Sequence, residues 1–134
     1  MADFNTDTPR GVIAQRIDDA HPSWRVDATP DAPDHLGRGG VFVAVYRTTI
    51  GKPAGAAALA HSVTVDLYGA ATLSASAEDR LDDLLDDLLT TIAAMGDVVW
   101  TNAQRTTFDS FHGWRITLDM HSADVYASAA RKRA

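Results

Sequence analysis

The residues that could do chemistry fall into three groups: a lysine loop, a pair of histidines and a run of aspartates. The lysine loop, Ile50–Pro53, places Lys52 beside a glycine, as a phosphate-binding loop does. The glycine spacing of that motif is missing, however, and no Ser or Thr follows the lysine. The segment is therefore interpreted as a solvent-facing loop.

The histidines are His112 and His121, which could face each other across a predicted final hairpin with Asp119 and Asp124 nearby. A metal site would need a third converging ligand, together with partners that orient the ligands. Two histidines without that constraint are interpreted as polar residues on a solvated strand end. The sequence predicts no metal and no cofactor.

The aspartates come in adjacent pairs along one predicted helix. A solvated helix face is the first interpretation, because charged runs usually face water. The second is a functional face that lines a channel in a ring, where like charge would keep DNA from sticking. The candidate residues are Asp79, Asp82, Asp83, Asp86 and Asp87.

Basic residues form the other candidate surface. Arg47, Arg105 and Arg115 stand on predicted strands and point away from the apolar side. They are either solubilising or partners in intersubunit ion pairs, since Arg is enriched at interfaces. The candidate subunit or tube contacts also include Lys52 and a basic C-terminal tip, which consists of Arg131, Lys132 and Arg133.

Composition sets limits on the class of protein. The chain has 134 residues, 46% of them hydrophobic, which fits one soluble domain over residues 1–134. A net charge of −6 argues against a dedicated nucleic-acid binder, and the absence of cysteine excludes disulfides. No apolar run is long enough to span a membrane, and no signal peptide is recognised. No catalytic arrangement of Ser, His, Asp or paired carboxylates survives inspection, so a non-enzyme is expected.

One amphipathic helix dominates the predicted architecture. Between Ser76 and Gly96, leucines recur at three- and four-residue steps, which predicts a helix with a wide apolar stripe. Ser76 is the predicted N-cap, and Gly96 is the predicted left-handed residue that ends the helix. A stripe this wide must be covered, so the strands are expected to form a sheet against it.

The remaining elements follow from caps and alternation. Thr8 and Pro9 open a short first helix that His21–Pro22 ends. Loops are expected at 30–40 and 50–60, and a turn at 109–113. Trp24, Trp100 and Trp114 fit strand alternation and are expected in the core or at its edge. The predicted strands are 24–28, 41–46, 61–69, 98–108 and 114–121.

These elements predict an α+β domain in the order α-β-β-β-α-β-β. The sheet is expected to be mostly antiparallel, with about five strands packed against the long helix. The order and the residues together resemble the tail terminator proteins of long-tailed, non-contractile phages. The resemblance covers about residues 8–126 and carries no active-site motif. It rests on Trp24–Val26, Val41–Arg47, Val63–Gly69, Trp100–Phe108 and Gly113–Met120, together with the acidic leucine helix.

The resemblance implies a structural role in the virion, with assembly in the host cytoplasm. Such proteins form a six-membered ring that caps the tail tube, stops its polymerisation and joins the head's connector. The implied partners are copies of the chain itself, the tail tube protein and the connector, while DNA passes nearby without specific binding. No membrane partner is implied. The alternatives are a connector or stopper protein of the neck, a tail tube subunit and a small ligand-binding α+β domain.

Overall fold

The structure is a computed structural model, and it describes residues 4–30, 36, 40–51 and 58–123. With 30% helix and 46% strand, it confirms the predicted α+β class and the predicted element order. The basic tip 131–133 and Lys52 lie outside the described residues, as does most of the predicted loop 30–40. The elements are α1 (Pro9–Ala20), β1 (Arg25–Asp27), β2 (Phe42–Gly51), β3 (Ala58–Ala70), α2 (Ala75–Ala93), β4 (Val98–Phe108) and β5 (Phe111–Ala123).

The five strands form one mixed sheet in the order β1-β2-β3-β5-β4. Only β1 and β2 run parallel; the other three neighbouring pairs are antiparallel. The prediction of a mostly antiparallel sheet of about five strands is therefore confirmed. The order also leaves two edges, a three-residue strand β1 and an eleven-residue strand β4.

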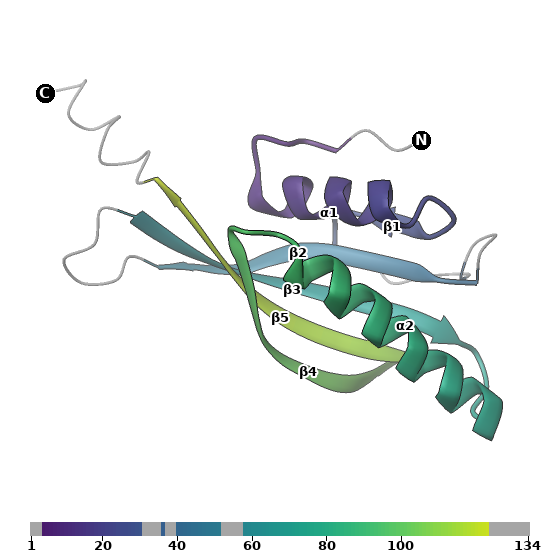
Figure 1. Cartoon of the computed structure of the whole chain (residues 1–134). Coiled ribbons are helices and arrows are strands. Elements are labelled where there is room, and N and C mark those ends of the chain that lie inside the picture. Colours follow the sequence, from purple (N-terminus) through teal and green to yellow (C-terminus); the bar gives the residue numbers. More distant parts are fainter. Residues whose placement is uncertain (1–3, 31–35, 37–39, 52–57, 124–134) are drawn as a thin grey trace, which may run out of the picture.

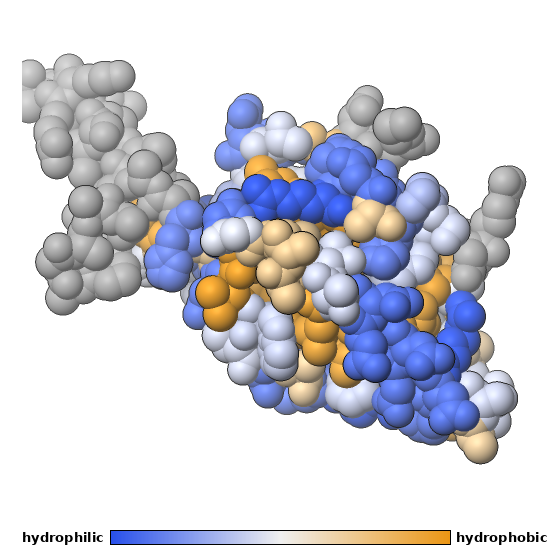
Figure 2. Space-filling view, in the orientation of Figure 1, coloured by the Kyte–Doolittle hydropathy of each residue, from blue (hydrophilic) through white to orange (hydrophobic). Residues whose placement is uncertain are grey.

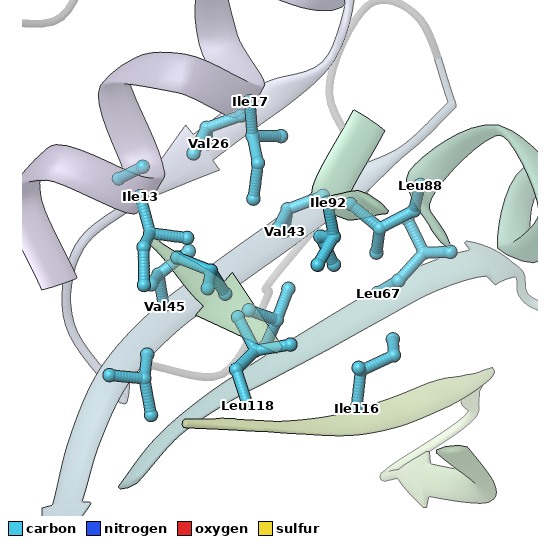
Figure 3. Packing of buried hydrophobic residues seen from close by; sticks show 14 of the residues in the cluster. Ile13, Ile17, Val26, Val43, Val45, Leu67, Leu88, Ile92, Ile116 and Leu118 are labelled. Carbon is cyan, nitrogen blue, oxygen red and sulfur yellow. The ribbon is translucent and has the colours of Figure 1, made fainter. Parts of the chain in front are cut away.

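Both helices lie on one face of the sheet, which we call the helix face (Figure 1). The main core fills the space between, with Ile13 and Ile17 of α1 over the first strands and Leu88 and Ile92 of α2 over the later ones (Figure 3). Helix α1 packs on the sheet, with Ile13, Ala14 and Ile17 in the main core. None of the described helices is long and apolar enough to cross a membrane.

The opposite face of the sheet, here the open face, carries no helix of the described chain (Figure 1). Phe42, Ala44 and Tyr68 are nevertheless buried there, and Leu36 packs against them. Both faces of β2 are thus covered near its start, as its unbroken apolar run predicts. Farther along the strands, this face is polar.

The caps of the helices are only partly as predicted. Thr8 Oγ1 accepts from Gly11 N at 3.1 Å, which confirms the first N-cap. The N-cap of α2 is Ser74, not Ser76, because Ser74 Oγ accepts from Ala77 N while Ser76 already lies inside the first turn. Gly96 is not left-handed: α2 ends at Ala94 in right-handed geometry, so no residue there needs a positive φ.

The predicted loop 50–60 is strand at both of its described ends, whereas residues 52–57 lie outside the described residues. Ile50 pairs with His61 and Gly51 with Ala60, and β3 continues on its other side to pair with β5. Small residues have weak strand preference, but pairing on both sides of β3 outweighs it. As a result, β2, β3 and β5 extend together beyond the helices at one end of the sheet (Figure 1).

The β4–β5 hairpin also differs from its prediction. Its turn is Asp109–Ser110 and not 109–113, because Phe108 already pairs with Phe111. In β4 the register shifts between Trp100 and Asn102, which marks a β-bulge at Thr101. The strict alternation expected over 98–108 is therefore wrong, because one extra residue reverses the faces of the side chains that follow.

Candidate functional site

An ion pair with a buried carboxylate lies at the centre of the open face. Asp66 of β3 lies directly opposite Arg115 of β5 in the antiparallel register. Arg115 Nε donates to Asp66 Oδ1 at 2.8 Å, and Nη2 donates to Oδ2 at 3.1 Å. The Tyr46 hydroxyl of β2 donates to the same Oδ2 at 2.9 Å. One carboxylate therefore connects three neighbouring strands.

The two sides of this pair differ in exposure. The Asp66 side chain is 6% exposed and that of Arg115 is 41% exposed, so the carboxylate is buried beneath a guanidinium that reaches water. The hydrogen bonds to Asp66 raise the pKa of Arg115 and keep it charged. Burial, together with the hydrogen bond to Asp66, raises the pKa of Tyr46 to about 12. Both shifts keep Arg115 and Tyr46 in the protonated forms that donate hydrogen bonds to Asp66. The three side chains therefore act as a structural clamp across the strands.

The structure pairs two of the three candidate arginines within the chain. Arg115 binds Asp66, and Arg105 Nη1 of β4 donates to Glu78 Oε2 of α2 at 2.6 Å. Arg47 forms no ion pair with any residue of the described chain. The prediction that all three point away from the apolar side is wrong for Arg105, because the bulge in β4 turns it to the helix face, where α2 lies. It is also wrong for Arg47, which pairs with the buried Val63 and therefore lies on the helix face.

The five candidate aspartates are exposed along the outer side of α2. Figure 2 shows a hydrophilic region over this helix, while Leu81, Leu84 and Leu88 are buried on its other side. Arg80 interrupts the row, but its Nε donates inward to the carbonyl of Gly69 at 3.2 Å. The arrangement is the solvated acidic face that the sequence predicts, and we call it the acidic ridge.

The outer edge of β4 is open among the described residues, because β4 pairs only with β5. Eight of its eleven residues are exposed. Three of these are large and apolar, namely Val99 at 62%, Trp100 at 41% and Phe108 at 47%. Trp100 is expected in the core or at its edge, but it is exposed and is not part of the main core, since the strand carrying it is the edge of the sheet.

The two other tryptophans agree better with the prediction. Trp24 is 9% exposed and stacks on the His21 ring with centroids 3.7 Å apart. Trp114 is partly buried against the main core. His21 Nε2 also lies 2.7 Å from Thr91 Oγ1 of α2, and burial lowers the pKa of this histidine. Sequence reasoning did not find this junction of the two helices, because it requires the packing of segments seventy residues apart.

The histidine metal site is not formed. His112 and His121 lie at opposite ends of the same strand, β5, so they do not face each other across a hairpin. No group of three metal-ligating side chains occurs within the described residues. The candidate ligand Asp124 lies outside them.

Two surface depressions represent the small-ligand alternative, and both are open to solvent. One lies where Arg16 meets the end of α2, and there Arg16 Nη1 donates to Asp97 Oδ1 at 2.6 Å. This hydrogen bond raises the pKa of Arg16 and lowers that of Asp97. The other runs along the acidic ridge beside Arg80. In the described part of the chain, neither combines an enclosed apolar wall with converging polar groups, as a ligand pocket does.

No protein-family model matches the chain, and no curated protein matches it.

Proposed function

We propose that this chain is a structural protein of phage tail assembly, which forms a ring on the finished tail tube, stops polymerisation and presents a surface for head joining. The observation that carries the proposal is the open edge of β4. Eleven residues of edge strand present unpaired backbone groups beside exposed apolar side chains. Such an edge is a template for another chain, as expected of a protein that works by assembling.

The phage assignment rests on the sequence resemblance. Its element order is also the order of the structure. A closed ring needs heterologous contacts, in which one surface of a subunit meets a different surface of the next. In this proposal the β4 edge is one such surface, and the next subunit supplies the other.

The projecting strand ends and the acidic ridge give the molecule different surfaces, as a ring that caps a tail tube needs. The paired ends of β2, β3 and β5 project past the helices, whereas the acidic ridge lies along α2 (Figures 1 and 2). A ring between tube and neck needs two different end faces and a wall that DNA can pass. The acidic ridge suits that wall, because its aspartates repel phosphates. The proposed partners are copies of the chain, the tube protein and the neck connector, within the virion.

The β4 edge gives the first test of this proposal. Val99→Lys places a charge on the exposed edge, a device that natural edge strands use against pairing. Leu73→Lys is the matched control, since Leu73 is 51% exposed but lies in the connection between β3 and α2 and not on the edge strand. Native mass spectrometry of purified chains should find six-membered rings for the wild type and for Leu73→Lys, and their loss for Val99→Lys. Equal ring formation by all three would contradict the role of this edge.

A neck connector is the alternative outcome. Purified rings should bind the end of isolated tail tubes if the chain is a terminator. Rings that ignore tubes and bind the head's portal-side ring instead would favour the connector.

A further inference from the structure

The open edge of β4 is poorly protected for a strand of its length. Natural edge strands are usually blocked by Lys, Pro, inward charges or bulges. Between Val98 and Phe108 there is no Lys and no Pro, and the single charged residue, Arg105, is already bound to Glu78. The bulge at Thr101 is the remaining device. An edge of this kind needs a partner whenever the chain is free in solution.

The register with β5 assigns each β4 side chain to a face. Trp100 pairs with Leu118 and Ala103 with Ile116, so these residues lie on the helix face. Asn102 and Gln104 pair with Thr117 and Arg115 and lie on the open face. By the same register, Arg105 and Thr107 lie on the helix face, whereas Val99, Thr106 and Phe108 lie on the open face.

We propose that, before assembly, two copies of the chain pair antiparallel through their β4 edges, about a two-fold axis at Gln104. Residues that meet across such a pair must share a face. In this register they do, provided that Trp100 and Thr101 together oppose one residue of the second copy, as they already do on β5. The facing pairs are Val99–Phe108, Trp100–Thr107, Asn102–Thr106, Ala103–Arg105 and Gln104–Gln104.

This register accounts for two of the three large apolar side chains that are exposed on β4. Val99 and Phe108, which are 62% and 47% exposed, would cover each other at both ends of the pair. The middle is polar, and two Gln104 amides can bond across the axis. No like charges face each other directly, which would be unfavourable in a strand pair.

Neighbouring registers lack this match. An axis at Arg105 places that residue opposite its own copy, so two like charges meet. An axis at Ala103 leaves Phe108 without an apolar partner. If the two-fold axis passes between two neighbouring residues, the residues that face each other come from opposite faces of the sheet, which the pleat forbids. The occupant that fits this edge best is therefore the same edge of a second copy.

The dimer has a consequence for assembly, a point that rests on the proposed function. A ring that uses the β4 edge for heterologous contacts cannot keep a two-fold contact at the same edge. The dimer would hide that edge until the tube end offers a better contact. A single strand pair covers less than the roughly 1,600 Å² of a standard interface, so the dimer should dissociate readily on dilution.

The absence of cysteine from the chain makes a direct test possible. In Gln104→Cys, two engineered thiols would meet at the axis, because facing strand residues have Cα atoms about 4.5–5.5 Å apart, within disulfide range. We expect roughly half or more of the free chain to form a disulfide dimer on mild oxidation, given that geometry. Reduction should return it to the untreated state.

Asn102→Cys is the matched control, an exposed amide on the same face of the same strand. In the proposed register its thiol lies about 14 Å from its own copy, four residues along a strand, and should not crosslink. The double variant Asn102→Cys/Thr106→Cys should crosslink again, because these positions face each other. Equal crosslinking of both single variants, or of neither, would overturn the proposed register.

The test separates the dimer from the ring. Crosslinking is measured on the cysteine variants of the free chain, and ring formation is measured on the wild-type chain, whose β4 edge is unaltered. Failure of the Gln104→Cys crosslink with rings still formed would overturn the dimer alone. A Gln104→Cys crosslink, together with a wild-type chain that forms no rings, would support the dimer and contradict the proposed function.

Discussion

Arg115 covers Asp66: the guanidinium of one strand closes over the carboxylate of the next, with N–O distances of 2.8 and 3.1 Å. The carboxylate is buried and the guanidinium is half-exposed. The tie joins β3 to β5, and the Tyr46 hydroxyl extends it to β2. The centre of the sheet is thus held from its open face as well as by the helices, while β4 lies outside the tie.

Removing Arg115 should cost more stability than removing another strand arginine. In Arg115→Leu, Asp66 is left buried without its counter-charge, and we expect the free energy of unfolding to fall by about 3 kcal/mol. Arg47→Leu is the control, since Arg47 is exposed on β2 and should change stability by less than about 0.5 kcal/mol. Urea unfolding measures both. Similar losses for the two variants would contradict the clamp.

Tyr46 makes stability depend on alkaline pH. Its pKa is raised from 10.0 to about 12 in the folded chain. A raised folded pKa contributes stability that is complete below pH 10 and is lost as the pH rises towards 12. Wild-type stability should therefore fall more steeply over this range than that of Tyr46→Phe. In an alkaline titration followed by tyrosinate absorbance, the variant should lose a component near pH 12. An unchanged titration would contradict the assignment.

Repulsion between the aspartates of the acidic ridge destabilises α2. Asp82 and Asp86 are four residues apart on α2, where like charges destabilise a helix by about 0.2–0.5 kcal/mol. Asp86→Lys replaces this repulsion with attraction, so the thermal midpoint should rise slightly. The same variant should make assembled rings retain DNA in a gel-shift assay at low salt. Asp86→Asn is the neutral control, and DNA retention by wild-type rings would contradict a repelling wall.

The β4–β5 turn gives a local test. Asp109 has φ 54°, the left-handed region that β-branched residues avoid. Asp109→Val should lower the free energy of unfolding by about 1–2 kcal/mol, whereas Asp109→Gly should preserve it. Ser110→Val, the neighbouring turn position without a positive φ, should cost less than Asp109→Val. Chemical denaturation orders the three variants.

The elements could be predicted from the sequence because their signals are local. The leucine period of α2 and the alternation of β5 each depend on neighbouring residues, and both elements form where expected. The errors occur where two neighbouring residues carry the same local signal. Ser74 and Ser76 are both competent caps, and only the path of the chain before α2 selects Ser74.

The contacts of the candidate site could not be predicted, because they depend on register. Alternation indicates that Asp66 and Arg115 share the polar face of neighbouring strands, but only the pairing of β3 with β5 brings them opposite each other. The bulge at Thr101 has no signal in the sequence of β4, and it turns Arg105 towards Glu78. The β4 edge is recognisable as an edge only when the strand order is known.

Tail length in particles assembled without this chain tests the central claim most directly. Negative-stain images should show tails much longer than normal and without heads, because nothing stops tube subunits from adding. Restoring the chain should return normal length and head joining. Tails of normal length that join heads in its absence would contradict the proposed role as a terminator.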